Sequence, residues 1–345
     1  MAMVKRDDLL KCLAAVEAGL SPKDVIEQSS CYVLRNGRMW TFNDNVACSV
    51  ILPSSMKNME CAIPSIEFRN LLSKLDEDEL DVILGGEGKS EDQLLLRMKR
   101  RRAGIRVQLS VSLPVDEIKM PEEWSSVPEG FAEAVETVGQ VAGKGEQLFV
   151  LSCVHITPKG LEACDNYQAI RYSLSTGLSE SVLVRRDDLV KAAKLDMEKW
   201  SLSQSWLHFR NSSGSEMSCR RWEQDYPRLG SLLQVEGHEG LLPKGLEEAI
   251  KKAEVFVSDR DGSSGLIIDL NSSRLLLRAE GSVGWYEERQ RVDYSGEPVS
   301  FRIAPRLLKE VCHRTSRCVI GATKLKVVGE KYVYVSCLAI DKEAE

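Results

Sequence analysis

The chain has 345 residues, a mass of 38.6 kDa and a formal charge of −6, from 46 basic and 52 acidic residues. This length exceeds one ordinary core and favours two or three domains, at about 150 residues each. Apolar residues make up 43% of the chain, and no run reaches the roughly 18 uncharged apolar residues of a membrane span, which excludes a membrane-spanning helix. Charged residues interrupt the first 20 positions, so no signal peptide is expected and we predict a cytoplasmic protein.

Cysteine and histidine are placed in a way that argues against metal sites and disulfides. The ten cysteines contain no C-x-x-C pair, and none of the four histidines has a second ligand at H-x-x-x-H or H-E-x-x-H spacing. We therefore expect buried free thiols, no metal and no cofactor. The acidic net charge by itself argues against a protein coated in positive charge for nucleic acid.

Six predicted helices recur along the chain at a period of about 60 residues. The clearest repeat is Val4–Lys11, which is similar to Val184–Lys191 and differs from it by conservative changes only. An apolar residue, a turn or cap position and an amphipathic run recur at starts 4, 63, 127, 184, 242 and 303. Proline at or near four of these starts fits the first helical turn, where its missing N–H costs nothing. The prolines are Pro64, Pro128, Pro243 and Pro305.

Between the helices, period-two runs bounded by turn residues predict strands. Residues 31–34 and 39–42 flank Asn36-Gly37 and predict a hairpin. Further strands are expected at 80–84, 94–98, 147–156, 206–209, 266–270, 275–278, 325–328 and 332–335. Each repeat is thus one helix plus about four strands, which is a small core, so two repeats should pair into one domain. The predicted fold class is α+β, with domains at 1–120, 121–236 and 237–345.

This arrangement resembles the bacterial DNA polymerase III beta subunit, the beta sliding clamp, along essentially the whole chain. The local matches are residues 4–16, 62–64 with 71–76, 163–169, 225–227, 292–298 and 332–335. The resemblance implies three similar domains, each of two helix-plus-sheet halves, that form a closed ring as a head-to-tail homodimer. It implies a DNA sliding clamp, a processivity factor that encircles duplex DNA and has no active site. Its implied partners are double-stranded DNA, a replicative polymerase, a clamp loader and a second copy of itself.

The charge pattern of the predicted helices can be compared with that implication. Five of the six helices carry basic residues opposite their apolar faces, whereas the third is acidic. Helix faces that are merely exposed to solvent would carry the same basic residues at any single position. The residues expected to face DNA are Lys11, Lys23, Arg69, Lys74, Lys144, Lys191, Lys194, Lys251, Lys252, Arg306, Lys309 and Arg314. The resemblance implies that the denser run Lys99–Arg102 lies at a strand turn on the sheet side, with a loader or DNA contact as the alternative.

The resemblance also implies an apolar pocket between the second and third domains, where client proteins dock a short peptide. Carried over position by position, its residues are Leu148, Cys164, Asn166, Tyr167, Gln168, Ala169, Pro227, Leu232, Val333 and Val335. Residues 166–168 replace the family's Gly, His and Arg, which fits a divergent or phage-encoded clamp with a private client. The alternatives are a clamp-like scaffold that is not loaded on DNA, and an enzyme, for which the sequence has no nucleophile elbow, P-loop, dinucleotide fingerprint or metal spacing.

In the ring that the resemblance implies, the first domain's edge meets the third's. The strand near residues 97–108 is then expected to meet one from around residues 265–278 of the other copy.

Overall fold

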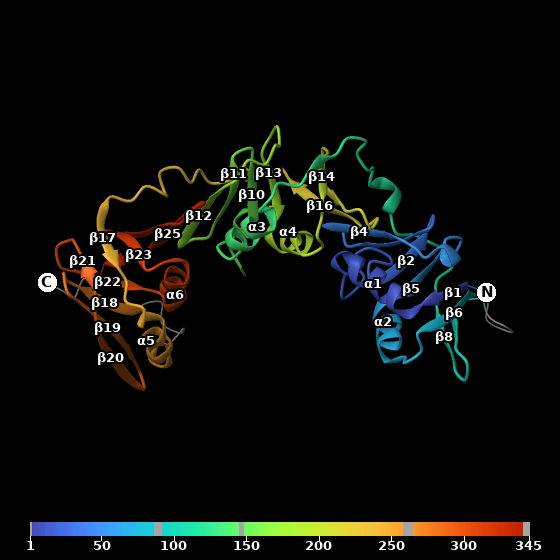
Figure 1. The fold of residues 1–345 in the computed structure, drawn as a ribbon, viewed down its shortest axis with the longest axis horizontal. Coiled ribbons are helices and arrows are strands. Elements are labelled where there is room, and N and C mark those ends of the chain that lie inside the picture. Colours follow the sequence, from blue (N-terminus) through green and yellow to red (C-terminus); the bar gives the residue numbers. More distant parts are fainter. Residues whose placement is uncertain (1, 86–91, 145–147, 258–264, 341–345) are drawn as a thin grey trace. The chain divides into compact units, whose positions relative to one another are not determined.

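The computed structural model describes residues 2–85, 92–144, 148–257 and 265–340 (Figure 1). Their contacts separate into two compact units. Unit 1 comprises Met1–Glu136 and Thr176–Glu223, and unit 2 comprises Thr137–Ser175 and Gln224–Glu345. The three predicted domains are not tested by this division and remain a prediction.

Within the described residues, the order strand, helix, three strands occurs six times. The predicted 60-residue repeat is therefore a structural repeat. Each copy, made of a strand, a helix and three further strands, is called a half because the copies pair two by two. The first three halves are β1 (Ala2–Lys5), α1 (Arg6–Val16), β2 (Cys31–Arg35), β3 (Arg38–Phe42), β4 (Val46–Ile51); β5 (Cys61–Pro64), α2 (Ser65–Lys74), β6 (Glu79–Leu84), β7 (Gln93–Arg97), β8 (Arg102–Arg106); β9 (Ser125–Ser126), α3 (Phe131–Gly139), β10 (Cys153–Thr157), β11 (Gly160–Cys164) and β12 (Gln168–Ser173).

The remaining three halves follow the same order. They are β13 (Val182–Arg185), α4 (Arg186–Ala193), β14 (Lys199–Leu202), β15 (Trp206–Arg210), β16 (Glu216–Trp222); β17 (Gly237–Leu241), α5 (Leu246–Ala253), β18 (Leu266–Leu270), β19 (Arg274–Gly281), β20 (Gly284–Arg291); β22 (Val299–Ile303), α6 (Pro305–Arg314), β23 (Arg317–Gly321), β24 (Lys324–Val328) and β25 (Tyr332–Cys337). Short additions are β21 (Asp293–Tyr294), β26 (Ala339–Ile340) and 3₁₀ turns, of which η3 (Val115–Glu117) and η4 (Phe149–Ser152) bear on the site.

The strands of unit 1 form antiparallel sheets. One has the order β1-β6-β7-β8. The other runs β5-β2-β3-β4-β16-β15-β14-β9, so the first half and the fourth half share one sheet. The joint between them is the pairing of β4 with β16, in which Ala47 lies opposite Ser218.

Unit 2 repeats this scheme. Its smaller sheet has the order β20-β19-β18-β22-β26. Its larger sheet runs β10-β11-β12-β25-β24-β23-β17-β21, and here the joint is the pairing of β12 with β25. Ala169 lies opposite Val335 in this joint.

The halves are interlocked through their first strands. β1 pairs with β6 of the second half, while β5 of the second half pairs with β2 of the first. β17 and β22 make the same exchange, with β23 and β18. Because each half completes the sheet of the other, a single half lacks a finished core. This explains physically why the 60-residue repeat comes in pairs.

The helices bury the faces that the sequence pattern predicts. Leu9, Leu13 and Val16 of α1 are buried, as are Leu307 and Leu308 of α6. α1 contacts α2 and lies against β4, and α5 contacts α6 and lies against β20. None of the described helices combines the length and the low polarity that crossing a bilayer requires. All ten cysteines are free thiols, and all but Cys312 and Cys337 are buried.

Most predicted elements are confirmed, and one strand boundary is wrong. Asn36 and Gly37 both have positive φ, +52° and +72°, and close the predicted hairpin between β2 and β3. The strand expected over 147–156 begins only at Cys153, and its first residue lies outside the described residues. The preceding stretch forms η4 because its hydrogen bonds return locally, Leu151 N–H to Leu148 O at 2.9 Å and Ser152 Oγ to Phe149 O at 2.6 Å.

Candidate nucleic-acid and peptide-docking sites

The basic residues predicted on the helices of unit 1 are exposed, and the structure separates those with acidic partners from those without. Lys11 lies 3.8 Å from Asp8, and Arg69 forms an ion pair with Glu17. Lys191 donates to the carbonyl of Ala18. Lys23, Lys74 and Lys194 are exposed and form no ion pair with any described residue.

In unit 2 the predicted cations are mostly paired with carboxylates. Lys251 lies 3.0 Å from Glu247 and 2.8 Å from Glu248, and Lys252 lies 3.2 Å from Glu288. Lys309 pairs with Glu254. Lys144 is exposed, without an ion pair to a described residue. Much of the positive charge on α5 and α6 is therefore neutralised within the protein.

Arg314 corrects the expectation that it lies on the exposed basic face of the last helix. Its side chain is only 6% exposed and pairs with Glu310 at 2.5 Å. Its guanidinium lies over the rings of Tyr332 and Tyr334, at 5.2 and 4.8 Å from their centres. The helical period places this residue near the edge of the apolar face, where two aromatic rings of β25 cover it.

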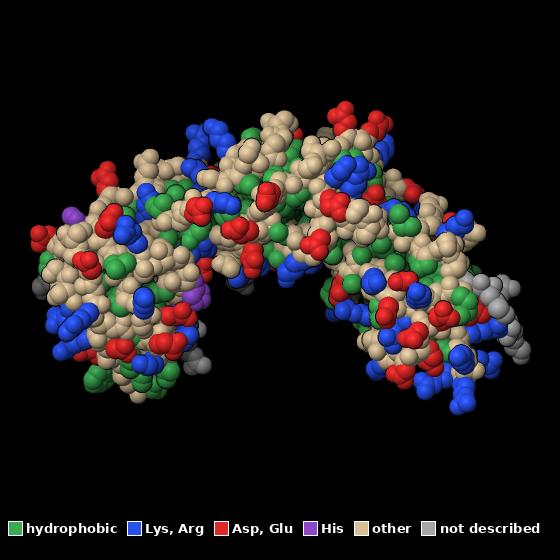
Figure 2. Space-filling view, viewed as in Figure 1, with side chains coloured by type: hydrophobic (Ala, Val, Ile, Leu, Met, Phe, Trp, Pro, Cys, Tyr) green, Lys and Arg blue, Asp and Glu red, His purple; other side chains and the backbone are tan. Residues whose placement is uncertain are grey.

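The basic run Lys99–Arg102 lies at the turn between β7 and β8, as predicted, and all four residues are exposed. Met98 N–H donates to Arg101 O at 2.9 Å and closes the turn, and Arg101 lies 3.9 Å from both Asp76 and Glu77. Figure 2 shows Lys and Arg side chains gathered at the end of unit 1 that carries this turn.

A cavity of about 90 Å³ lies at the β12–β25 joint in unit 2. Its lining contains seven of the ten residues that the resemblance assigned to the client pocket: Cys164, Asn166, Tyr167, Gln168, Ala169, Leu232 and Val335. These seven residues come from three separate stretches of the sequence, which the cavity brings together. Asp165, Lys324 and Cys337 complete the lining and were not predicted. Their positions follow from the pairing of β12 with β25 and of β24 with β25, which the sequence pattern does not reveal.

The three remaining predicted pocket residues lie outside the lining. Leu148 is 73% exposed. Val333 is partly buried and packs on the cluster beneath the cavity, formed by Leu151, Cys164, Ala169, Leu229, Leu233 and Val335. Pro227 is half-buried in the segment that leads to this cluster.

The turn from β11 to β12 forms one wall of the cavity, and Asp165 holds its shape. Asp165 Oδ1 accepts hydrogen bonds from Tyr167 N–H at 2.7 Å and Gln168 N–H at 2.9 Å, while Oδ2 accepts from Gln168 Nε2 at 3.1 Å. Gln168 Oε1 accepts from the hydroxyl of Tyr334 at 2.8 Å. Arg306 of α6 lies 3.5 Å from Asp165 Oδ2 and 5.5 Å from the centre of the Tyr167 ring. This wall is thus fixed by β25 on one side and by α6 on the other.

Solved structures with a similar fold cover nearly the whole chain. The DNA polymerase III beta chain from Streptococcus pneumoniae matches with a TM-score of 0.84 at 14% identity, over 98% of this chain and 99% of its own. The Caulobacter crescentus beta sliding clamp matches at 0.82 and 14%, and the Pseudomonas aeruginosa beta subunit at 0.81 and 16%, both with the same coverage. The chain has the sliding-clamp fold. No family model matches the sequence.

The clamp fold accounts for the architecture but, at these identities, not for the activity. Among the described residues, no three His, Cys, Asp or Glu side chains are grouped as metal ligands. Burial raises the pKa of the Cys164 thiol, although the hydrogen bond that its sulfur accepts from the Tyr226 hydroxyl lowers it. Partial desolvation of the Cys337 thiol, in an otherwise exposed residue, raises its pKa, although Lys324 lowers it, so both thiols stay protonated at neutral pH.

Proposed function

We propose that this chain is a DNA sliding clamp, in which two copies close head to tail around duplex DNA and tether a replicative polymerase. The similarity to DNA polymerase III beta subunits over 98% of the chain supports this proposal. The six-fold repeat supports it independently, since six halves per chain give twelve helices in a two-copy ring.

Ring closure is supported by a rule in the strand pairing. The last strand of the first half pairs with that of the fourth (β4 with β16), and the last strand of the third half pairs with that of the sixth (β12 with β25). The last strands of the second and fifth halves, β8 and β20, are each paired on one side among the described strands. The same joint between copies would pair β8 with β20 head to tail.

This rule corrects the expected position of the interface in the third domain. The sequence suggested a strand around residues 265–278, but β18 lies between β19 and β22, and β19 lies between β18 and β20. The edge strand next to β19 is β20, at residues 284–291. The sequence pattern did not predict strand β20 because its residues are mostly polar and every second residue is exposed.

The proposed DNA contacts are the exposed cations on the helices and on the loops that follow them. Duplex DNA attracts such residues through its phosphates without regard to sequence, which suits a ring that must slide. Those whose side chains have neither an ion pair nor a hydrogen bond to a described residue, Lys23, Lys74, Lys144 and Lys194, are the strongest candidates. Docking of polymerase and clamp loader peptides is proposed for the cavity at the β12–β25 joint. Its altered wall at residues 166–168 favours a private client of a divergent or phage-encoded clamp.

Retention on circular DNA tests the function directly. Clamp, loader and nicked circular plasmid are mixed and passed through a sizing column in 150 mM salt, before and after the plasmid is cut once. A sliding clamp co-elutes with the circle and is lost from the linear form, because enclosure depends on DNA topology and charge attraction does not. Equal retention on both forms would contradict the proposal.

A second candidate, a clamp-like scaffold that docks partners without being loaded on DNA, has its own support. The carboxylates that neutralise Lys251, Lys252 and Lys309 reduce the charge available to phosphates on α5 and α6. Such a scaffold would bind client peptide normally in solution and show no retention on either DNA form at any loader concentration.

A further inference from the structure

The two joints within the chain have equivalent hairpins on either side, and these hairpins give the strand register of the joint between copies. In the first, third and fifth halves the last hairpin has two residues between its closing pair. The closing pairs are Asn43 and Val46, Asp165 and Gln168, and Gly281 and Gly284. The next residue of the last strand is Ala47, Ala169 or Trp285, so these three positions are equivalent.

The hairpins on the other side of each joint align in the same way. In the fourth, sixth and second halves the closing pairs are Asn211 and Ser215, Gly329 and Tyr332, and Met98 and Arg101. Three residues beyond each closing pair lie Ser218, Val335 and Gly104. These three positions are therefore equivalent as well.

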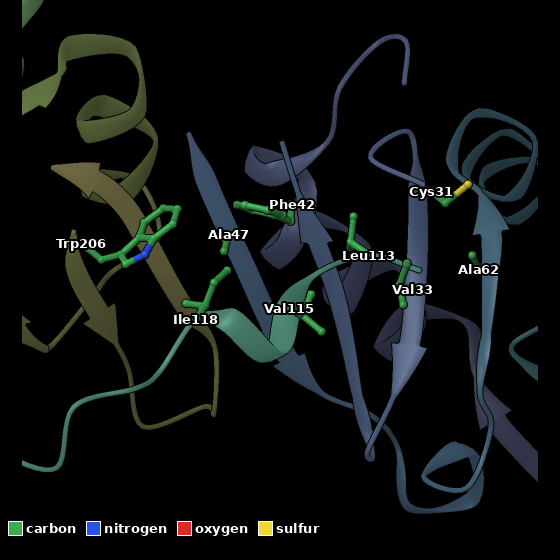
Figure 3. Close-up of a cluster of buried hydrophobic side chains, with 9 residues drawn as sticks. All are labelled: Cys31, Val33, Phe42, Ala47, Ala62, Leu113, Val115, Ile118 and Trp206. Carbon is green, nitrogen blue, oxygen red and sulfur yellow. The ribbon is translucent and has the colours of Figure 1, made fainter. Parts of the chain in front are cut away.

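The two internal joints share one register. Ala47, which lies in the buried cluster at the β4–β16 joint together with Phe42 and Trp206 (Figure 3), faces Ser218. Ala169 faces Val335 in the β12–β25 joint.

The same register between copies places Trp285 of β20 opposite Gly104 of β8. The two residues are complementary in size, because Trp285 is largely exposed and Gly104 has no side chain. Counting along antiparallel strands from this pair puts Glu287 opposite Arg102 and brings Arg289 beside Arg100. The basic turn Lys99–Arg102 of one copy then lies against the C-terminal end of β20 of the other.

The unit 2 side of this contact is basic. Arg291 of β20 directly faces Arg274 of β19, and both are exposed without an ion pair to a described residue. Like charges directly opposite each other on neighbouring strands destabilise a sheet. Arg289 pairs with Glu287 at 3.0 Å, whereas Glu288 points to the opposite face because side chains alternate along a strand.

The unit 1 side is basic too. Lys99, Arg100 and Arg102 are exposed and form no ion pair with a described residue, while Arg101 lies 3.9 Å from both Asp76 and Glu77. Closing the ring would set these cations against the arginines of β19 and β20. Salt screens their repulsion incompletely, because the Debye length of about 8 Å exceeds the strand spacing of about 4.8 Å.

We propose that ring closure assembles a binding site for a small polyphosphate anion from both copies. One copy supplies the turn Lys99–Arg102, and the other supplies Arg274, Arg289 and Arg291. The inference rests on the proposed head-to-tail ring and deepens it by adding a ligand that promotes closure.

The chemistry of the cluster selects this ligand. Arginine binds phosphate oxygens through its planar fork of N–H groups, and several arginines together match the charge of a polyphosphate. A small anion fits better than a long strand because the cations gather around one end of the strand pair. Neither copy holds all of them, so the anion binds the closed joint more tightly than the separate chains and shifts the equilibrium toward the dimer.

Sedimentation of the full chain over a range of concentrations measures this shift. Millimolar sodium tripolyphosphate should lower the Kd of the dimer by about tenfold or more, relative to sodium chloride of equal ionic strength. The matched salt is the control because any salt screens the repulsion. Equal dimerisation in the two salts would overturn the inference, as would a stronger effect of a single-stranded oligonucleotide at the same phosphate concentration.

Variants on each side of the joint test whether both copies contribute. Arg274→Ser, Arg291→Ser removes cations from unit 2, and Lys99→Ser, Arg100→Ser removes them from unit 1. Each double variant should dimerise more tightly than the unaltered chain in chloride, because repulsion is reduced, and should lose the response to tripolyphosphate. The control Lys159→Ser, at the exposed turn between β10 and β11, should respond like the unaltered chain. A response that depends on one side alone would place the site within a single copy and overturn the inference.

Cysteine pairs test the register on which the site depends. Gly104→Cys with Trp285→Cys should give a covalent dimer on mild oxidation. Arg106→Cys with Glu287→Cys is four residues out of register and should not. Failure of the first pair to link, or preferential linking of the second, would separate the basic turn from the arginines and overturn the inference.

Retention on circular DNA distinguishes this inference from the proposed function. A chain that is retained on the circle but does not respond to tripolyphosphate is a clamp without the anion site. A chain that neither dimerises nor is retained in the presence of a loader contradicts both.

Discussion

Arg306 of α6 and Asp165 of the pocket wall lie 3.5 Å apart, and the same guanidinium covers the ring of Tyr167. A helix that the sequence assigned to DNA is therefore in direct contact with the turn that shapes the proposed peptide pocket. The Asp165 side chain is 5% exposed and also binds two backbone N–H groups, so it connects these two regions.

Replacing Asp165 distinguishes its two roles. Asp165→Ala should lower the free energy of unfolding by about 1 to 3 kcal/mol, because buried N–H groups lose their acceptor. Asp165→Asn should cost less, since Asn43 holds the equivalent turn in unit 1 with an amide oxygen. The pairing with Arg306, worth up to about 1 kcal/mol for a half-exposed partner, is then lost, together with the hydrogen bond from Gln168 Nε2 to Oδ2. Urea unfolding measures both, and equal losses would show that the side-chain oxygen does not hold the turn.

Self-association through β20 can be tested at its exposed edge. Trp285 is 71% exposed, and Glu287 is also exposed on this strand. The double variant Trp285→Glu, Glu287→Lys should shift sedimentation from twice the mass of one chain to 38.6 kDa, because it removes apolar contact area and reverses a charge.

A matched control for the β20 variant is Val328→Glu, which alters a residue of similar exposure on β24. It should leave the mass unchanged. If the β20 variant is still a dimer, the interface does not lie at this edge.

The pairing of the cations predicts unequal effects on DNA binding. Lys194 has no ion pair among the described residues, whereas Lys252 is paired with Glu288. Lys194→Ala should reduce the slope of log affinity against log salt by about 0.9, the value for one phosphate contact, and Lys252→Ala should change it less. Filter binding over 50 to 200 mM salt measures both. The proposed ranking of the cations fails if the two slopes fall equally.

Acid should destabilise unit 1 through His208. This residue is fully buried between Ser203 and Ser218, and desolvation lowers its pKa to about 4. In the unfolded chain this histidine takes up a proton near pH 6.5, whereas in the folded chain it does so only near pH 4. The free energy of unfolding therefore falls as the pH drops from about 6.5 to about 4. A shift of this size corresponds to about 3 kcal/mol.

Urea unfolding at pH 7.5 and pH 4.5 measures the effect of His208. His208→Gln should lose less stability between these two values than the unaltered chain, because glutamine does not titrate. The exposed His238 provides the control, and His238→Gln should behave like the unaltered chain. If His208→Gln has the same pH dependence, the buried imidazole is not responsible.

The sequence predicts the repeating elements well because they depend on local patterns. The apolar period of α6 predicts the burial of Leu307 and Leu308, and Asn36-Gly37 predicts the turn between β2 and β3. It fails where local patterns are weak. The polar strand β20 was missed, and Arg314 was placed on the wrong face because Tyr332 and Tyr334, which cover it, lie in another strand.

By itself, the sequence determined the six-fold repeat, the position of its helices and most of its strands, because helix period, strand alternation and turn residues act over a few positions. Tertiary structure decided which strands join the halves, which cations remain unpaired and where a cavity is left. These depend on side chains that meet across strands, as Trp206 meets Arg220 and Lys324 meets Cys337, and such contacts leave no mark in the local pattern.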